Sequence, residues 1–379
     1  MRFPEFGGEW EKYKVSDVLD FYSTNSLSWE QLDYDNEELH NLHYGLIHVG
    51  LPILVDIRQN KLPGIKTDCK PKNFELCKEG DVAFADASED TNDVAKAIEF
   101  INLNNQKVVC GLHTIHGRDN KGLTVPGYKG YTFASPLFHN QIRKIAQGTK
   151  IYSISSKNFA ECYIGIPSRE EQSKIAKLLA LIDTRISTQI KIIDKLESLI
   201  KGLCQTLFNF EEYTTYFLGD ICSIVTGKLD ANAMVENGKY PFFTCAEEVF
   251  SIDEYTFDTE ALLISGNGAN LGYIHYYNGK FNAYQRTYVL DKFAIDINYV
   301  RLYLETFLKY RIEQEKNTGN TPYIVLGTLS KMKIKVPNTI TQQKIIQSID
   351  SLKEKLSIEK QSLKKHEEQK RYLLSNLFI

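Results

Sequence analysis

The stretch Ile166-Pro-Ser-Arg-Glu-Glu-Gln-Ser-Lys-Ile175 has a counterpart 170 positions later, at residues 336–345. Pro167 matches Pro337, Gln172 matches Gln342, and Lys174-Ile175 matches Lys344-Ile345. The residues before the prolines also correspond, as do two Leu-Phe pairs, Leu207-Phe208 and Leu377-Phe378. Because internal repeats decide architecture, we expect two similar halves, each a globular head followed by the same closing segment.

Each proline is predicted to end a strand and to introduce a long helix. Ser168 and Glu171 have the spacing of a capping box, and Thr341 is a looser counterpart in the second copy. Apolar residues then recur at alternating steps of three and four, which indicates a heptad seam. The seam consists of Ile175, Leu179, Ile182, Ile186, Ile193, Leu196, Ile200, Leu203 and Leu207 in the first copy, and of Ile345, Ile349, Leu352, Leu356, Leu363, Leu373 and Leu377 in the second.

The two predicted helices need a partner for their seams. An ordinary coiled-coil dimerisation element is one interpretation, but such an element normally occurs once, at one end of a chain. Here two copies each follow a head, so we expect them to pair with each other, antiparallel, within one chain. A helix of about 40 residues spans about 60 Å, and the pair is predicted to act as a ruler between two DNA-reading heads.

The expected fold class is α+β, with two mixed α/β heads, two long antiparallel coiled-coil helices and a pseudo-twofold arrangement. The first head is assigned to residues 1–167, the first helix to 168–212, the second head to 213–337 and the second helix to 338–379. In the first head we predict strands at 44–55, 107–112, 131–134 and 151–155, and a helical stretch at 93–100.

The first head contains a segment typical of a DNA-contacting loop. Residues 113–131 are rich in glycine, amide and basic side chains, and Asp119 is the only acid between Lys107 and Lys150. Arginine pairs with guanine, amides pair with adenine, and lysines bind phosphates. The predicted contacts are Arg118, Asn120, Lys121, Lys129, Gln141, Arg143 and Lys144, although each could equally be a solvated surface residue.

The second head is predicted to be built from hairpins. We expect strands at 259–265 and 273–277, a glycine-rich turn at 266–272, an Asn278-Gly279 turn and a further run at 280–290. The 266–272 turn lacks the Lys-Ser/Thr of a phosphate-binding loop and is followed by strands. The predicted DNA contacts are Asn267, Asn270, Lys280, Gln285 and Arg286.

Composition restricts the other possibilities. The formal net charge of −3 argues against a protein that coats DNA nonspecifically. No stretch is long and apolar enough to cross a bilayer, so we expect a cytoplasmic protein without a membrane partner. The seven cysteines stand singly and the two His-x-x-His pairs lack companion ligands, so neither a disulfide nor a metal site is predicted.

At this point the sequence resembles the specificity subunits of type I restriction-modification systems. The resemblance covers nearly the whole chain and rests on the two proline-to-helix junctions, the terminal Leu-Phe pairs, residues 80–91 and Tyr284-Gln-Arg-Thr-Tyr288. It implies that the heads are target-recognition domains, each reading one half of a bipartite double-stranded DNA target.

The resemblance also implies partners and cofactors. Two adenine-N6 methyltransferase subunits would bring S-adenosylmethionine, and restriction subunits would bring ATP and magnesium, whereas this chain would bind no cofactor and have no catalytic residue. The sequence agrees, since it contains neither an Asn/Asp-Pro-Pro-Tyr/Phe methylation motif nor a Walker A motif. Two alternatives stay open: a coiled-coil adaptor with no DNA role, and an enzyme with an unfamiliar site.

Overall fold

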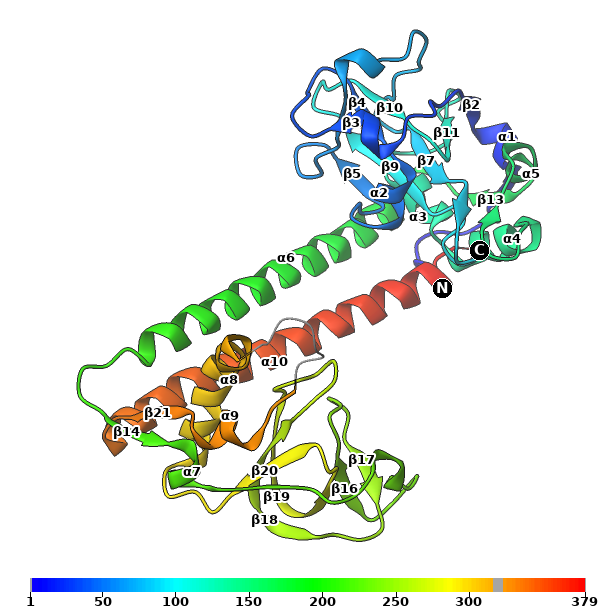
Figure 1. The fold of residues 1–379 in the computed structure, drawn as a ribbon. Coiled ribbons are helices and arrows are strands. Elements are labelled where there is room, and N and C mark those ends of the chain that lie inside the picture. Colours follow the sequence, from blue (N-terminus) through cyan, green and yellow to red (C-terminus); the bar gives the residue numbers. More distant parts are fainter. Residues whose placement is uncertain (1, 316–322, 379) are drawn as a thin grey trace. The chain divides into compact units, whose positions relative to one another are not determined.

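The computed structural model describes residues 2–315 and 323–378 and divides the chain into two compact units. Unit 1 comprises residues 1–190 and 362–379, and unit 2 comprises residues 191–361. Two long helices, α6 (Arg169–Leu207) and α10 (Thr339–Asn376), each contribute one segment to either unit. Each unit therefore contains one predicted head and parts of both helices (Figure 1).

Unit 1 is built around a five-stranded sheet with the order β2-β11-β7-β9-β5. Its strands are β2 (Asp20–Tyr22), β11 (Thr114–Arg118), β7 (Val82–Ala85), β9 (Ala97–Asn102) and β5 (Leu54–Asp56). The helices α2 (Tyr44–His48) and α3 (Tyr128–Phe133) pack against it, on β7 and β9 (Figure 1). A four-stranded sheet lies beside it, formed by β10 (Val108–Cys110), β4 (His40–Leu42), β6 (Gly64–Ile65) and β3 (Leu32–Asp33).

Three further helices and two short strand pairs complete the head of unit 1. The helices are α1 (Val15–Val18), α4 (Pro136–Ile145) and α5 (Ser156–Ala160). The strand pairs are β1 (Glu11–Lys14) with β13 (Tyr163–Ile166), and β8 (Ala87–Ser88) with β12 (Tyr152–Ser153). Phe84, Phe133, Phe138 and Phe159 form an aromatic core between the sheet and these helices.

Unit 2 contains a six-stranded sheet with the order β15-β20-β18-β19-β16-β17. Its strands are β15 (Ser223–Thr226), β20 (Thr287–Asp291), β18 (Phe257–Ser265), β19 (Ile274–Ala283), β16 (Tyr240–Phe243) and β17 (Phe250–Ile252). The helix α8 (Ile297–Gln314) buries Tyr299, Leu304 and Leu308 in the core that this sheet shares with the long helices. The short helices α7 (Leu218–Ile221) and α9 (Leu326–Ser330) and the strand pair β14 (Thr214–Phe217) with β21 (Lys333–Val336) complete the unit.

The sequence repeat is confirmed by equivalent hydrogen bonds in the two units. The Gln172 Nε2 atom donates to the Pro167 carbonyl at 2.9 Å, and Gln342 Nε2 donates to the Pro337 carbonyl at 2.9 Å. The hydroxyl of Tyr128 donates to the Gly165 carbonyl, and that of Tyr299 donates to the Lys335 carbonyl. The acceptor residues are 170 positions apart in both cases, Pro167 and Pro337 in the first and Gly165 and Lys335 in the second. Each junction of strand and long helix is therefore held by the same hydrogen bonds.

The long helices pair antiparallel within each unit. In unit 1, Lys370 of α10 lies 2.6 Å from Asp183 of α6, and in unit 2, Lys360 lies 2.6 Å from Glu197. The residue number falls along one helix as it rises along the other, as antiparallel pairing requires. Every predicted seam residue is buried or half-buried. The terminal Phe378 packs on Tyr128 in unit 1, and Phe208 packs on Tyr299 in unit 2.

Several local predictions are wrong. Residues 44–55 were expected to form one strand, but α2 occupies their first part, where the His43 ring caps the helix by accepting from the Gly45 amide. Residues 131–133 belong to α3, and Ala134 is its C-cap. All residues of α3 are buried, so the helix shows no amphipathic pattern. Residues 97–100 lie in β9, between two strands and fully buried, rather than in a helix.

Two turn predictions and one cap prediction also need correction. Residues 113–131 are not a single loop, because β11 and α3 occupy much of this range. The Asn278-Gly279 pair is not a turn, since β19 continues through it opposite Thr259 and Glu260 of β18. Asn338 rather than Thr341 caps α10, because its Oδ1 accepts from the Thr341 amide at 2.9 Å. The predicted strand at 259–265 and turn at 266–272 are confirmed.

We expect Gln172→Ala to lower the free energy of unfolding of unit 1 by about 1–3 kcal/mol, because buried polar groups lose their partners. Gln172 donates to the Pro167 and Leu123 carbonyls and accepts from the Val125 amide. Both tryptophans, Trp10 and Trp29, lie in unit 1, so their fluorescence during denaturation reports on this unit. Gln347→Ala, at an exposed site on α10, is the control, and equal effects would contradict the prediction.

Candidate nucleic-acid interface

In unit 2, four predicted contact residues gather at one end of the six-stranded sheet. Asn267 and Asn270 lie in the 266–272 turn between β18 and β19, and Gln285 and Arg286 lie in the turn that leads into β20. The two turns are joined because the Gly266 amide donates to the Arg286 carbonyl at 2.9 Å. Gln285 and Arg286 are exposed, so amide and guanidinium groups are available at this sheet end.

The structure adds Lys228 to this sheet end, which we call surface A: Lys228, Asn267, Asn270, Gln285 and Arg286. Lys228 follows β15, and its neighbour Leu229 accepts through its carbonyl from the Gln285 amide at 2.8 Å. Lys228 is exposed. No local pattern predicts this position, because the parallel bridge between Leu229 and Tyr284 joins segments far apart in the chain. Glu247 and Glu248 are exposed just beyond β16 and add acceptors near this end.

Lys280 is not brought together with surface A. It pairs with Asp258 across β18 and β19, whereas the turn that carries Asn267 and Asn270 lies beyond Ile264 and Ile274. Six residues of strand separate these positions, which is about 20 Å. The Lys280 ammonium lies over the Tyr255 ring, 4.7 Å from its centroid. The sequence placed Lys280 in the same set only because β19 and its following turn are contiguous in the chain.

In unit 1, Arg118 is held inside the protein by carboxylates. Its Nε and Nη2 atoms donate to the two oxygens of Asp81, each at 2.8 Å, and its Nη1 donates to Glu75 at 2.7 Å. The guanidinium also lies over the Tyr22 ring at 4.3 Å. The side chains of Arg118 and Asp81 are 8% and 1% exposed, so this is a buried ion pair. Nε, Nη1 and Nη2 each donate to groups of the protein itself, which is not the arrangement expected of a base-reading arginine.

Lys129 is also directed inward. Its ammonium lies 3.2 Å from a carboxylate oxygen of Glu99 and donates to the Thr124 hydroxyl at 2.9 Å. Burial raises the pKa of Glu99, while Lys129 and the amides of Gly127 and Gly130 stabilise its charged form. Lys129 is buried on α3, so its role in the structure is to balance a buried carboxylate.

Asn120 and Lys121 remain at the surface of unit 1. The Asn120 amide donates to Asp20 at 2.6 Å and to the Tyr22 hydroxyl at 2.7 Å, and Lys121 donates to the Asp17 carbonyl. Asn120 lines a cavity of about 320 Å³, together with Lys78, Asp119 and the edges of Arg118 and Lys129. The sequence missed Lys78, which is exposed beside this cavity.

Gln141, Arg143 and Lys144 form a separate group on α4. The Gln141 Nε2 atom donates to the Tyr163 carbonyl, and its Oε1 accepts from the Tyr163 amide, so Gln141 links α4 to β13. Arg143 donates to Asn140 and is exposed. Lys144 lines a groove of about 750 Å³ together with Arg2, Lys12 and Tyr163. Glu9 also lines this groove, and the Arg2 guanidinium is already paired with Glu171 at 2.6 Å. Lys12 and Lys144 supply the ammonium groups that suit a phosphate backbone.

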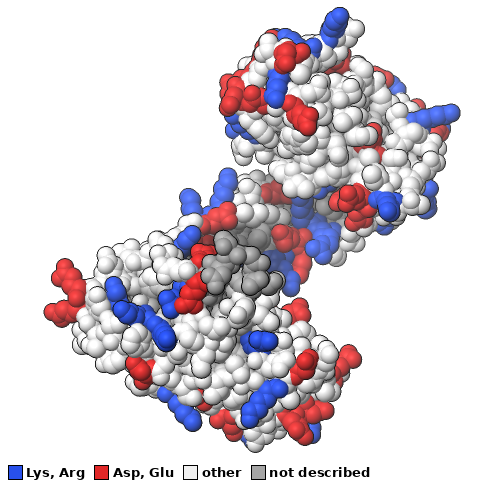
Figure 2. Space-filling view, in the orientation of Figure 1, with Lys and Arg blue, Asp and Glu red and all other residues white. Residues whose placement is uncertain are grey.

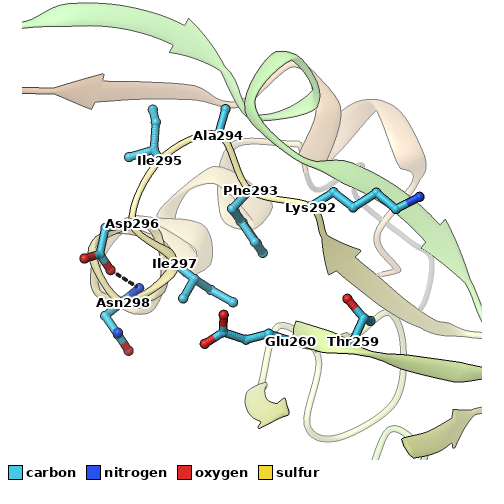
Figure 3. A pocket seen from close by; sticks show the side chains of 9 residues that line it. All are labelled: Thr259, Glu260, Lys292, Phe293, Ala294, Ile295, Asp296, Ile297 and Asn298. Atoms are coloured by element: carbon cyan, nitrogen blue, oxygen red, sulfur yellow. Dashed lines mark hydrogen bonds between the residues drawn. The ribbon is translucent and has the colours of Figure 1, made fainter. Parts of the chain in front are cut away.

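A further cavity in unit 2 is unsuited to phosphate. It has a volume of about 670 Å³ and lies between β18 and the start of α8, with Glu260, Asp296 and Lys292 among its lining residues. Asp296 caps α8 by accepting from the Asn298 amide, and Figure 3 shows that Lys292 extends away from Glu260. Two carboxylates without a facing cation repel an anion.

The charge of the surface is mixed rather than uniformly basic. Figure 2 shows lysine and arginine interspersed with aspartate and glutamate on the face drawn, in each of the two units. Such a surface supplies local contacts without a broad positive field. In the described part of the chain, no helix is long and apolar enough to span a membrane.

The chain is similar to specificity subunits of type I restriction-modification systems. A family model described as the type I restriction modification DNA specificity domain matches residues 210–368. The type I restriction enzyme EcoDI specificity subunit of Escherichia coli is 40% identical over 141 residues, which are 37% of this chain and 31% of that protein's length. A putative type I specificity subunit of Mycoplasma pneumoniae is 26% identical over 211 residues, which are 52% of this chain and 76% of that protein.

Solved structures share the fold over the whole chain. The crystal structure of a type I restriction-modification system S subunit from M. genitalium matches with a TM-score of 0.64 at 18% identity, covering 100% of this chain and 99% of that one. A structure from work on complex assembly and conformational transition of the type I restriction-modification system matches with a TM-score of 0.60 at 15% identity, covering 98% and 97%. These matches confirm the predicted fold class, two mixed α/β heads with two long helices.

Proposed function

Because the chain belongs to the family of type I restriction-modification specificity subunits, we propose that each unit reads one half of a bipartite double-stranded DNA target. The observation that carries this proposal is surface A, where side chains from three separate turns supply amide, guanidinium and ammonium groups at one sheet end. Amides and guanidinium groups recognise base edges in the major groove, and the ammonium suits a phosphate.

In unit 1 the corresponding contacts come from exposed polar side chains rather than from Arg118 and Lys129. Asn120 and Lys78 line the smaller cavity, Lys121 is exposed next to Asn120, and Arg143 and Lys144 lie on α4. Arg118 stabilises the strand that leads to Asn120, so it positions the surface without touching DNA. This arrangement divides the predicted set into surface contacts and internal supports.

The chain is proposed to supply recognition and no catalysis. Two methyltransferase subunits would bind it and bring S-adenosylmethionine, and restriction subunits would bring ATP and magnesium, all in the cytoplasm. The helices α6 and α10 physically join the units and would set the gap between the half-sites. In support, α6 and α10 are 39 and 38 residues long, each about 60 Å.

We expect Arg286→Ala to relax the sequence preference at one base pair of one half-site and to weaken binding of the complex by about 5- to 150-fold, since a bidentate contact contributes about 1–3 kcal/mol. Lys280→Ala, in the same sheet but away from surface A, is the matched control. The measurement is the affinity for a set of duplexes with single substitutions. Equal effects of both variants, or changes in both half-sites, would contradict the assignment of surface A.

Salt dependence distinguishes the proposal from a coiled-coil adaptor. The complex with methyltransferase subunits should bind DNA with an affinity that falls steeply as salt rises, because phosphate contacts release counterions. It should also retain a preference for one sequence at every salt concentration. A complex that assembles but shows no DNA affinity would favour the adaptor. Methyl transfer or cleavage by the purified chain alone would favour an enzyme instead.

A further inference from the structure

Two buried cysteines and a histidine meet in the core of unit 1. Cys77 precedes β7, Cys110 ends β10, and His116 lies in the middle of β11. The sulfurs of Cys77 and Cys110 are 3.6 Å apart. A ring nitrogen of His116 and these two sulfurs all lie within 4.8 Å of one another. All three residues are buried. They come from three segments that are separate in the chain, so the sequence offered no ligand spacing.

The orientation of His116 is fixed by a carboxylate. Its Nε2 atom lies 2.7 Å from an oxygen of Asp81, and Asp81 is held in turn by Arg118. The other ring nitrogen, Nδ1, is buried and has no hydrogen-bond partner among the residues that the structure describes. A histidine that donates one nitrogen to a carboxylate and keeps the other free has the arrangement of a metal ligand with its supporting carboxylate. A buried nitrogen without a partner otherwise destabilises the fold.

We propose that Cys77, Cys110 and His116 bind a soft d10 cation, Zn²⁺ or Cu⁺, which holds β10, β11 and the segment before β7 together. Two thiolates on a tetrahedral zinc ion lie about 3.8 Å apart, given Zn–S bonds of about 2.3 Å, and this matches the observed sulfur separation. Thiolate ligands select these two metals over harder cations.

Charge balance supports a metal at this place. Metal-binding cysteines are thiolates, so a cation bound between these two buried sulfurs would compensate their negative charge. One Zn²⁺ and two thiolates together carry no net charge, and such a cluster avoids the cost of an isolated buried ion. The three protein ligands leave a fourth tetrahedral position of zinc to a small ligand such as water, whereas Cu⁺ is satisfied by three.

The metal would stabilise the recognition surface of unit 1 without contacting DNA. Cys77 adjoins Lys78, and His116 lies two residues before Arg118, both of which line the 320 Å³ cavity. A metal that holds Cys77 and His116 in place would therefore also hold the backbone at Lys78 and at Arg118, on two sides of that cavity. This inference does not depend on the DNA-binding proposal, because a protein with any other function would show the same metal content.

The test is the metal content of the full chain, purified from cells supplied with zinc and, separately, with copper. We expect close to one equivalent of metal in the wild type, and loss of most of it in Cys77→Ser and in Cys110→Ser. Cys162→Ser is the matched control, since Cys162 is buried in the same unit and donates to the Asn158 carbonyl, which serine can also do. The metal recovered identifies zinc or copper.

A second measurement keeps the inference open to refutation if the serine variants do not fold. Wild-type chain refolded with Co²⁺ should develop thiolate-to-cobalt charge-transfer absorption and the d–d bands of a tetrahedral site, and added Zn²⁺ should abolish them. A wild type that takes up no metal and gives no cobalt spectrum overturns the inference. So does metal that remains in the Cys77→Ser and Cys110→Ser variants, because it would then be bound elsewhere.

Discussion

Replacing Arg118 by alanine is expected to lower the free energy of unfolding of unit 1 by about 3–5 kcal/mol, because it leaves a buried carboxylate without its cation. Asp81 is almost fully buried and receives two hydrogen bonds from Arg118. Burial acts to raise the pKa of Asp81, but hydrogen bonds from His116 and Arg118 outweigh it and keep the pKa below its usual value. Removing Arg118 takes away part of that compensation.

The measurement is denaturant unfolding followed by the fluorescence of Trp10 and Trp29, which report on unit 1. Arg143→Ala is the matched control, because Arg143 is exposed and donates to the nearby Asn140, so we expect a change within about 0.5 kcal/mol. At temperatures where Arg118→Ala is folded, the sequence preference of the complex should be unchanged. A variant that unfolds normally but reads a relaxed sequence would identify Arg118 as a base contact.

Shortening both long helices by one heptad is expected to abolish binding to the native target and to shift the preferred gap by about three base pairs. Deleting residues 187–193 from α6 and 362–368 from α10 keeps the seam in register on both sides of the cut. It also preserves the Asp183–Lys370 and Glu197–Lys360 ion pairs. Seven residues of helix are about 10 Å long, and one base pair of DNA is about 3.4 Å.

The matched control inserts one heptad at the same positions, which should lengthen the preferred gap by a similar amount. Deletion from α6 alone should instead destabilise the chain, because the partner helix would then lose its register. The readout is the affinity of the assembled complex for duplexes that differ only in gap length. A double deletion that binds the native gap with unchanged affinity would contradict the proposed ruler.

The repeat and the seam were predictable because they depend on regular spacing. The prolines at 167 and 337, the matched Gln172 and Gln342, and the steps of three and four are readable in the sequence, and each has a structural counterpart. Between Leu363 and Leu373 the steps of three and four place the polar Lys370 in the second seam, and in the structure Lys370 forms an ion pair with Asp183 of α6. The pairing of the two long helices could therefore be predicted from the spacing of apolar residues within each helix.

The heads were less predictable because their elements are short and buried on more than one side. All residues of α3 are buried, so no apolar stripe distinguishes the helix from a strand. Arg118 looked like a surface residue because the residues that neutralise it, Glu75 and Asp81, lie about forty positions earlier in the chain. Lys228 lies in surface A because a bridge between Leu229 and Tyr284 brings it there, and no local sequence pattern predicts that bridge.

Recognition of one half-site by each unit is tested most directly by mapping adenine methylation in the DNA of cells that express this chain with its methyltransferase subunits. We expect one methylated motif made of two specified blocks, separated by a fixed number of unspecified base pairs. Exchanging residues 213–337 for those of a relative should change one block and leave the other intact. An uninterrupted motif, or a single exchange that alters both blocks, would contradict the claim that each unit reads its own half-site.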